Sequence, residues 1–458
     1  MGNNNLKPFF DPRSVAVVGA SDKPGKISNI IVRSLKAAFP GPIYPVNPKY
    51  TSVEGLKCYP SVQDIDGKVD LAIYALPAGA TPDAIRSSSG KVGGAILVSG
   101  GFAEAGESGR ALEKELKETA RHEGIRIIGP NCMGIYDNVS RLDTFFISTE
   151  RIRRPAPGGV SIISQSGSFA ITAMDELASE GVGVARVISY GNRMDVNESD
   201  CLEFLADDPA TTAVALYIES VEDGRRFVEA AKRCSSKKPV MAVKVGKYGA
   251  GARAALSHTG AMAGRLEVYR AAFKKAGVVE LAGYEDFLAG CKVFGKDLRP
   301  EGNRVMIITD GGGMGVEIAD ACLAMGLEVP PLTEDVKEAI APLFPQYFAI
   351  GNPIDLTGSA TDDMFAQALE KAMSSDGFDI AIVAALWGPP ALTDDLPELL
   401  SEKAVFTGKP VIICSPGGEY TRQRLGLFRK FGFPVFTTPE GAVRGAAALA
   451  RNRKRADG

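Results

Sequence analysis

Two histidines occur in the 458-residue chain, and one of them lies where an imidazole could act as a nucleophile. His258 stands in Ser257-His258-Thr259-Gly260-Ala261-Met262-Ala263-Gly264, where almost every neighbour is small. Small neighbours leave the ring accessible, and imidazole is both largely neutral and strongly nucleophilic near pH 7. A histidine in a glycine-rich loop can also be a solvated surface residue, so the rest of the chain must decide. We expect His122, at a predicted helix end, to be a surface residue.

Three turns could bind phosphate, because each places glycine or hydroxyl residues after the first predicted strand of a series and before a helix. Such a helix start exposes unpaired amides and a partial positive charge. The turns are Gly19-Ala20-Ser21 through Gly25-Lys26, Ser164-Gln165-Ser166-Gly167 and Gly311-Gly312-Gly313. A helix cap or tight turn explains any one of them equally well. Three in one chain, beside an accessible histidine, favour phosphate chemistry.

Short apolar runs alternate with helical patterns, which is typical of parallel sheets covered on both faces. This alternation of strands and helices occurs in three successive series, which are separated by a proline-bearing linker at 151–157 and a polar linker at 295–302. We therefore predict an α/β protein of three doubly wound parallel-sheet domains, the first Rossmann-like and the other two flavodoxin-like. The predicted domains span 1–135, 136–298 and 299–458. The predicted strands are 14–18, 42–46, 70–74, 94–98, 125–128, 159–163, 213–217, 239–243, 303–308, 380–383 and 410–413.

Composition indicates a globular enzyme, with 45% hydrophobic and 23% charged residues. No apolar segment is long enough for a membrane span, and the N-terminus lacks the pattern of a secretory signal. We therefore expect a cytoplasmic protein. A net charge of −3 gives no general attraction to nucleic acid. Seven scattered cysteines without CxxC spacing argue against a disulfide framework or a zinc site, and we expect buried thiols.

The order and spacing of several short motifs make the chain resemble the α subunit of the NDP-forming acyl-CoA synthetases. This is the ADP-forming acetate:CoA ligase group, which is related to succinyl-CoA synthetase. The motifs are Gly19-Ala20-Ser21, Pro45-Val46-Asn47-Pro48-Lys49, Ser99-Gly100-Gly101-Phe102-Ala103-Glu104, Gly129-Pro130-Asn131-Cys132-Met133-Gly134, Ser164-Gln165-Ser166-Gly167, Tyr217-Ile218-Glu219-Ser220, Ser257-His258-Thr259-Gly260 and Asn352-Pro353-Ile354-Asp355-Leu356-Thr357-Gly358. The resemblance implies that His258 is transiently phosphorylated and that Glu219 orients its ring. It also implies that the helix starts at Ser164–Gly167 and Gly311–Gly313 hold the phosphoryl group from two sides.

The resemblance further implies that coenzyme A lies across the carboxyl ends of the first domain's strands, where doubly wound sheets bind ligands. Backbone at Gly19, Ala20, Ser21 and Gly25 would then cradle phosphate, and Lys26 and Lys49 would neutralise it. The other expected contacts are Asn47, Ala75, Pro77, Ser99, Gly100, Asn131 and Cys132. We expect Cys132 to be a buried thiol lining the coenzyme A channel rather than a nucleophile.

The implied activity is the reversible conversion of acyl-CoA, ADP and phosphate to acid, coenzyme A and ATP. No G-x-x-x-x-G-K-[ST] loop or nucleotide-grasp segment is recognisable. The resemblance implies that a separate ATP-grasp β subunit, in an α2β2 assembly, brings ADP and Mg²⁺. Two alternatives remain. A noncatalytic coenzyme A sensor would leave Glu219 and His258 without purpose, and an NAD dehydrogenase is disfavoured by the Gly19 turn and by Asn47-Pro48-Lys49.

Overall fold

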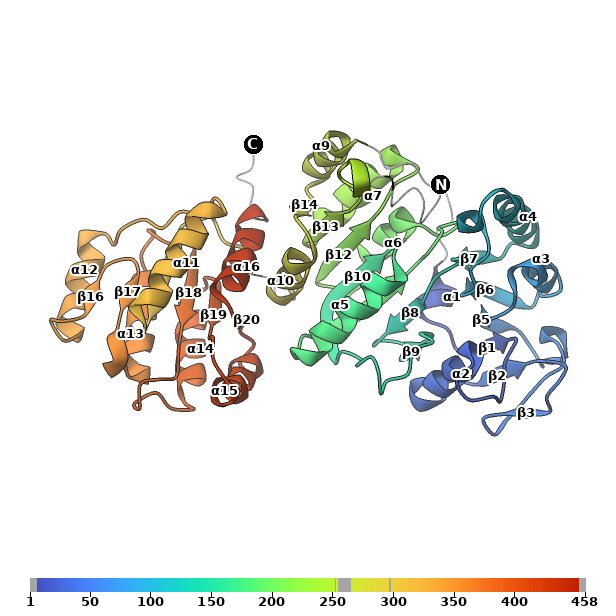
Figure 1. Ribbon diagram of the computed structural model, residues 1–458, viewed down its shortest axis with the longest axis horizontal. Helices are drawn as coiled ribbons and strands as arrows, with labels where there is room; N and C mark the ends of the chain where they lie inside the picture. The colour runs from blue at the N-terminus through green and yellow to red at the C-terminus, as the bar shows by residue number, and fades with distance from the viewer. Residues whose placement is uncertain (1–5, 252, 254–264, 296–297, 453–458) are drawn as a thin grey trace. The chain divides into compact units, whose positions relative to one another are not determined.

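The computed structural model describes residues 6–251, 253, 265–295 and 298–452. The chain divides into two compact units, residues 1–283 and 284–458. Three large sheets with helices packed against them make up these units (Figure 1). The predicted α/β class is confirmed, and each of the eleven predicted strands is found within a few residues of its expected place.

The first sheet is entirely parallel and has the order β2-β1-β5-β6-β7. Its strands are β1 (Val15–Val18), β2 (Ile43–Val46), β5 (Val69–Tyr74), β6 (Val92–Leu97) and β7 (Arg126–Ile128). Strands β3 (Ser52–Val53) and β4 (Leu56–Lys57) form a separate two-stranded sheet, and β4 contacts β2. The helices are α1 (Lys7–Phe10), α2 (Ile27–Ala38), α3 (Thr81–Arg86) and α4 (Glu107–Glu123). The strand order reverses between β1 and β5, which is where a doubly wound sheet opens a crevice for a ligand.

The second sheet has seven strands in the order β14-β13-β12-β10-β11-β8-β9. They are β8 (Gly134–Asp137), β9 (Leu142–Asp143), β10 (Pro157–Ser164), β11 (Val184–Ser189), β12 (Ala213–Ile218), β13 (Val240–Lys244) and β14 (Val279–Leu281), with helices α5 (Gly167–Ser179), α6 (Glu198–Leu205), α7 (Gly224–Ser235) and α9 (Leu266–Ala276). Strand β8 runs antiparallel to β11, and β9 in turn runs antiparallel to β8. The sheet is therefore mixed at this edge, which the expectation of a parallel sheet did not include.

The third sheet has the order β16-β17-β15-β18-β19-β20, and β16 is its one antiparallel strand. Its strands are β15 (Val305–Thr309), β16 (Ala349–Ile350), β17 (Ile354–Asp355), β18 (Ile380–Ala384), β19 (Val411–Cys414) and β20 (Val435–Phe436). Its helices are α10 (Tyr284–Phe294), α11 (Gly312–Ala324), α12 (Glu334–Ile340), α13 (Asp362–Met373), α14 (Leu396–Thr407), α15 (Glu419–Lys430) and α16 (Pro439–Arg451). Helix α10 packs against α16, so the second compact unit begins at Tyr284. The domain boundary predicted near residue 298 stays a prediction.

Alternation along β1 shows how the first unit is built. Val15 and Val17 enter a core that continues through both sheets of the unit, whereas Ala16 and Val18 face the core under α3 and α4. Side chains of a strand point to opposite faces in turn, so a continuous apolar run such as Val15–Val18 is buried on both sides. The shared core joins the first two sheets into one compact unit.

Candidate active site

A cleft of about 470 Å³ opens at the carboxyl edge of the first sheet. It lies at the reversal of strand order, and its walls are the turns that follow β1, β2, β5 and β6. Eight of the residues predicted to contact coenzyme A line it: Gly19, Ser21, Lys26, Asn47, Lys49, Ala75, Pro77 and Ser99. Five further residues line the cleft without having been predicted from the sequence: Lys23, Ile27, Ser28, Tyr50 and Leu76. Their places in or beside the same turns were the available signal.

The backbone amides of Gly19 and Ala20 already form hydrogen bonds within the fold. Both amides donate to the carbonyl oxygen of Val46, at 2.9 and 3.2 Å. Asn47 Nδ2 donates to the carbonyl oxygen of Ala20 at 2.7 Å and so fixes the same turn. Gly19 has φ +86°, and a Cβ there would lie 2.6 Å from the carbonyl oxygen of Ala75. These amides therefore shape the turn, and phosphate contact at Gly19 and Ala20 stays a prediction.

Positive charge and a helix start remain available at this cleft. Lys23, Lys26 and Lys49 are exposed, and none forms an ion pair with a residue that the structure describes. Helix α2 begins after Lys26 without a side-chain cap, so its first amides point outward. The Ser21 hydroxyl lies beside them and accepts a hydrogen bond from the Lys23 amide at 3.2 Å. Ammonium groups, a hydroxyl and a helix N-terminus together can bind a phosphorylated ligand.

The remaining predicted contacts lie beside the cleft rather than on its wall. The Asn131 amide donates to the carbonyl oxygen of Ser99 at 3.0 Å, and a Cβ on Gly100 would lie 3.3 Å from Asn131 Oδ1. Gly25 is exposed, with φ +81°. Cys132 is buried and donates to the carbonyl oxygen of Leu97, and burial raises the pKa of the Cys132 thiol to about 12. Cys132 is thus the expected buried thiol, and its contact with coenzyme A stays a prediction.

The carboxyl edge of the second sheet brings Gln165 and Glu219 together. Gln165 follows β10 and Glu219 follows β12, and these strands are neighbours in the sheet. Gln165 Oε1 accepts hydrogen bonds from the backbone amides of Glu219 at 2.9 Å and Ser220 at 3.1 Å. Glu219 itself is buried. The Gln165 oxygen thus fixes the turn that carries the predicted partner of His258, and phosphate binding by Gln165 stays a prediction.

Two further side chains hold this turn, and neither was predicted from the sequence. Buried Arg193, which follows β11 and has φ +54°, donates from its guanidinium to the carbonyl oxygen of Ser220. The hydroxyl of Tyr269 on α9 accepts from the Val221 amide at 3.0 Å. Side chains from three separate elements therefore define the backbone around Glu219. No local pattern in the sequence indicated that these elements would meet.

Lys244 ends β13 and lies next to the Glu219 turn, since it pairs with Ile218 across the two strands. Its side chain is only 1% exposed, its ammonium donates to the carbonyl oxygen of Val245, and it lies 4.7 Å from the centre of the Tyr269 ring. Burial lowers the pKa of Lys244 to about 8, although the nearby Glu219 carboxylate acts in the opposite direction. The sequence could have indicated Lys244 as a candidate site residue, because it is a charged residue directly after the apolar run 239–243.

Helix α5 begins at this same edge with the predicted phosphate-binding residues. Ser166 caps the helix through its hydroxyl, which accepts from the Phe169 amide at 3.3 Å and lies 3.0 Å from the Ser168 hydroxyl. The Ser164 hydroxyl is buried and donates to the carbonyl oxygen of Ser166. The amides of Gly167 and Ser168 stand in the first turn, where a helix offers no internal acceptor. They are the groups of this turn that can still receive an anion.

The glycine turn of the second unit is similar but more acidic. The Gly311 amide donates to Thr309 Oγ1 at 3.0 Å, whereas Gly312 and Gly313 stand in the first turn of α11, where amides lack intrahelical acceptors. A Cβ on Gly312 would lie 2.4 Å from Asp355 Oδ2, so the backbone must approach that carboxylate closely. Burial, together with Asp355, raises the pKa of Asp310 to about 6. Phosphate binding at Gly311, Gly312 and Gly313 stays a prediction.

His258 lies outside the described residues. His122 is exposed, as expected, and its Nδ1 lies 3.0 Å from Glu123 Oε1. All seven cysteines are buried free thiols. Within the described part of the chain, no group of three or more His, Cys, Asp or Glu side chains is placed to hold a metal ion. None of the helices described there has the length and apolar character needed to cross a bilayer.

Comparison with known proteins assigns a family model to each sheet. A CoA binding domain matches residues 13–138, and a succinyl-CoA ligase like flavodoxin domain matches residues 157–294. A ligase-CoA domain matches residues 305–413. The three matches follow the order of the sheets along the chain and support the predicted fold.

Relatives that match nearly the whole of this chain support the same assignment. The α subunit of acetate–CoA ligase (ADP-forming) II from Pyrococcus furiosus is 37% identical over 99% of both chains. The acetate–CoA ligase (ADP-forming) I of Archaeoglobus fulgidus is 38% identical over 98% of this chain and 64% of its own length. The solved dinucleotide-forming acetyl-coenzyme A synthetase 1 of Ca. Korarchaeum cryptofilum, in complex with phosphate and ADP, superposes with a TM-score of 0.90. It is 33% identical over 98% of this chain and 97% of its own. The chain belongs to the family of ADP-forming acetate–CoA ligases and corresponds over its full length to their α subunit.

Proposed function

We propose that this chain is the α subunit of an ADP-forming acyl-CoA synthetase that works through an acyl phosphate and a phosphohistidine. The reaction reversibly converts acyl-CoA, ADP and phosphate to the acid, coenzyme A and ATP. Residues 1–135 would bind coenzyme A, 136–298 would carry His258, and 299–458 would supply the second phosphate-binding helix start. The observation that carries the proposal is the buried Glu219 turn, fixed by Gln165 beside the start of α5.

The chemistry divides into three balanced steps. A phosphate oxygen attacks the thioester carbonyl carbon, the C–S bond breaks, and coenzyme A leaves as a thiolate to give an acyl phosphate. A ring nitrogen of His258 then attacks phosphorus, the P–O bond to the acyl group breaks, and the acid leaves as a carboxylate. In the last step the N–P bond breaks as a terminal oxygen of ADP takes the phosphoryl group. Splitting the transfer in this way replaces one difficult step by easier ones.

Glu219 acts on the imidazole rather than on the phosphoryl group. Its carboxylate accepts a hydrogen bond from the second ring nitrogen, which fixes the tautomer and stabilises the cationic ring, as a carboxylate does in hydrolase triads. The Gln165 and Arg193 contacts hold the backbone of this carboxylate in one place. The free amides of Gly167 and Ser168 at the start of α5 receive the phosphoryl oxygens.

Coenzyme A would occupy the cleft of the first sheet. The ammonium groups of Lys23, Lys26 and Lys49 would neutralise its phosphates, with the Ser21 hydroxyl as a further donor. The nucleotide and Mg²⁺ would come with an ATP-grasp β subunit in an α2β2 complex in the cytoplasm. The relatives named as α subunits support a separate partner chain.

The test mixes the chain with a β subunit, acetyl-CoA, Mg²⁺ and ³²P-phosphate. The expected result is acid-labile, base-stable label on this polypeptide, absent from His258→Ala and slowed in Glu219→Gln. His122→Ala is the matched control and should be labelled normally. Coenzyme A binding should persist in all three variants. Normal labelling of Glu219→Gln would remove the role given to Glu219, and coenzyme A binding without label from several acyl-CoAs would favour a noncatalytic sensor.

A further inference from the structure

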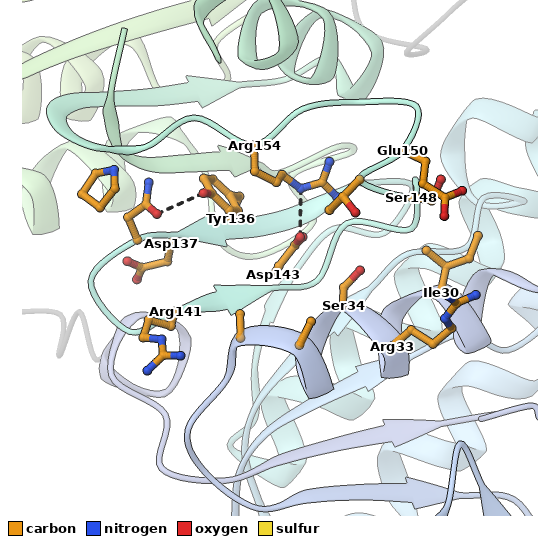
Figure 2. A pocket seen from close by; sticks show the side chains of 15 residues that line it. Ile30, Arg33, Ser34, Tyr136, Asp137, Arg141, Asp143, Ser148, Glu150 and Arg154 are labelled. Carbon is orange, nitrogen blue, oxygen red and sulfur yellow. Dashed lines mark hydrogen bonds and ion pairs between the residues drawn. The ribbon is translucent and has the colours of Figure 1, made fainter. Parts of the chain in front are cut away.

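A second cavity, of about 550 Å³, lies in the first unit away from the residues given to the reaction (Figure 2). One wall is the middle and end of α2, and the other is the β8–β9 hairpin with the loop that leads to β10. The cavity is within the size range of small-molecule sites. Only the first turn of α2 borders the cleft of the first sheet, so the two cavities share a helix but no lining residue.

Two of the carboxylates in this cavity are already neutralised. Arg186 forms buried ion pairs with Asp137 and Asp208, and the carboxylate of Asp137 is thereby occupied. Arg154 Nε donates to Asp143 Oδ2 at 2.8 Å, and its other nitrogens donate to backbone carbonyl oxygens at 2.8 Å each. Three of the five N–H donors of Arg154 are thus used within the fold, and its charge is paired with Asp143, so most of its capacity for an anion is taken.

Two other arginines have that capacity. Arg33 on α2 and Arg141 in the β8–β9 turn are exposed, and neither forms an ion pair or side-chain hydrogen bond with a described residue. Figure 2 shows them on opposite sides of the cavity. Glu150 is the single lining carboxylate that lacks an ion pair with a described residue. Two open guanidinium groups and one open carboxylate thus line the cavity, and this excess of positive charge attracts anions.

The turn that carries Arg141 is firmly built. Asp137 Oδ1 accepts from the amides of Val139 at 2.7 Å and Ser140 at 3.3 Å, so the buried Asp137–Arg186 pair anchors the turn. Arg141 itself has φ +60°, a conformation uncommon outside glycine. The guanidinium therefore projects from a defined backbone, which lowers the entropy lost when it binds a ligand.

The space between the arginines is of mixed character. Ile30, Ala37, Ala38 and Pro157 supply apolar surface, and Ser34, Ser148 and Thr149 supply hydroxyl groups. We propose that this cavity binds a small organic dianion, with one carboxylate or phosphate group on Arg33, the other on Arg141, and its uncharged body between them. Guanidinium groups bind both kinds of oxyanion in bidentate geometry. The site is independent of the proposed reaction.

Calorimetry on the full-length chain tests the site. The carboxylate probes are the dianions succinate, adipate and suberate, and the phosphate probe is fructose 1,6-bisphosphate, which has a more highly charged group at each end. Butyrate is the single-charge comparison. We expect at least one of the probes with two anionic groups to bind more tightly than butyrate. Arg33→Gln and Arg141→Gln should each weaken it by roughly tenfold or more, because each removes charge-assisted hydrogen bonds. Ala37→Phe should block binding by filling the space while both charges remain.

Two matched variants locate the ligand. Arg110→Gln removes an exposed arginine on α4, and Lys49→Gln removes a cation of the cleft in the first sheet. Both should bind the dianion as the unaltered chain does. Loss of binding in Lys49→Gln with normal binding in Arg141→Gln would place the ligand in the other cleft and overturn the proposal. Absence of binding by every probe, or equal loss in Arg110→Gln, would overturn it as well.

Discussion

Gln165 holds Glu219 in place, since its side-chain oxygen accepts from the Glu219 amide at 2.9 Å and from the next amide at 3.1 Å. A single carboxamide thereby satisfies two buried donors and fixes the backbone of the residue proposed to orient His258. The two residues are far apart in the sequence, and the pairing of β10 with β12 brings them together.

The first prediction concerns this contact. Gln165→Leu leaves two buried amides without acceptors, which costs about 1–3 kcal/mol each. We expect a lower free energy of unfolding in urea and slower ³²P labelling. Gln165→Glu retains an acceptor and should unfold closer to the unaltered chain, yet label slowly because it places a second carboxylate beside Glu219. Full labelling of both variants would show that the turn needs no such support.

The second prediction compares two glycines with similar positive φ values. Gly19→Ala places a Cβ 2.6 Å from the carbonyl oxygen of Ala75, whereas a Cβ on Gly25 meets nothing within 4 Å. We expect Gly25→Ala to cost about 1 kcal/mol from backbone conformation alone. Gly19→Ala should cost more and weaken coenzyme A binding, because the β1 turn must move. Urea unfolding and calorimetry measure both, and equal costs would contradict the close approach.

The third prediction concerns the pH dependence that Lys244 contributes. Its pKa is lowered to about 8 in the folded chain by burial, against the opposing effect of Glu219, with Lys247 also lowering it. Between that value and the ordinary value of 10.5, the unfolded chain binds more protons, so stability from this group rises with pH. Lys244→Met should therefore gain stability relative to the unaltered chain below pH 8. The gain, on the order of 2 kcal/mol, should vanish as pH rises towards 10.5.

Urea unfolding followed by circular dichroism measures this difference. The comparison of two chains cancels the titration of all other groups. Lys238→Met is the matched control, because burial also lowers the pKa of Lys238 but its ammonium donates to three carbonyl oxygens at 2.8 Å each. It should lose stability at pH 7. A difference between Lys244→Met and the unaltered chain that does not change with pH would contradict the lowered pKa of Lys244.

The fourth prediction concerns Asp310 in the second unit. Burial and the Asp355 carboxylate raise the pKa of Asp310 to about 6, from an ordinary value of 3.8. The folded state then binds more protons than the unfolded state between these values, so the contribution of Asp310 to stability falls as pH rises through 6. Asp310→Asn keeps an acceptor for the Leu386 amide and should be more stable above pH 6, by an amount on the order of 2 kcal/mol.

The single tryptophan makes this measurement specific. Trp387 is the neighbour of Leu386 and lies in the second unit, so its fluorescence reports the unfolding of that unit. The advantage of Asp310→Asn should disappear near pH 4. Asp395→Asn, at an exposed helix start, is the control and should show no such trend. An unchanged advantage at pH 4 would mean that packing, rather than charge, separates the two chains.

The sequence by itself determined the elements of the fold and the positions of most of the cleft. Apolar runs such as Val15–Val18 predict buried parallel strands, and turns such as Gly19–Ser21 follow them directly. Carboxyl ends of parallel strands share one edge, so residues placed after different strands were expected to meet there. Eight of the predicted contacts do line one cleft. This inference succeeds because it depends on local pattern and on a general rule of topology.

Only the tertiary structure decided which polar groups were already occupied. The Gly19 and Ala20 amides donate to the carbonyl oxygen of Val46, and the Gln165 side-chain oxygen accepts from the Glu219 amide. The sequence predicted phosphate binding at these three residues and indicated neither of these internal partners. The antiparallel β8–β9 hairpin and the Arg33–Arg141 cavity likewise depend on packing between distant segments. Hydrogen-bond capacity is limited, and which partner takes it depends on distances that no local pattern in the chain contains.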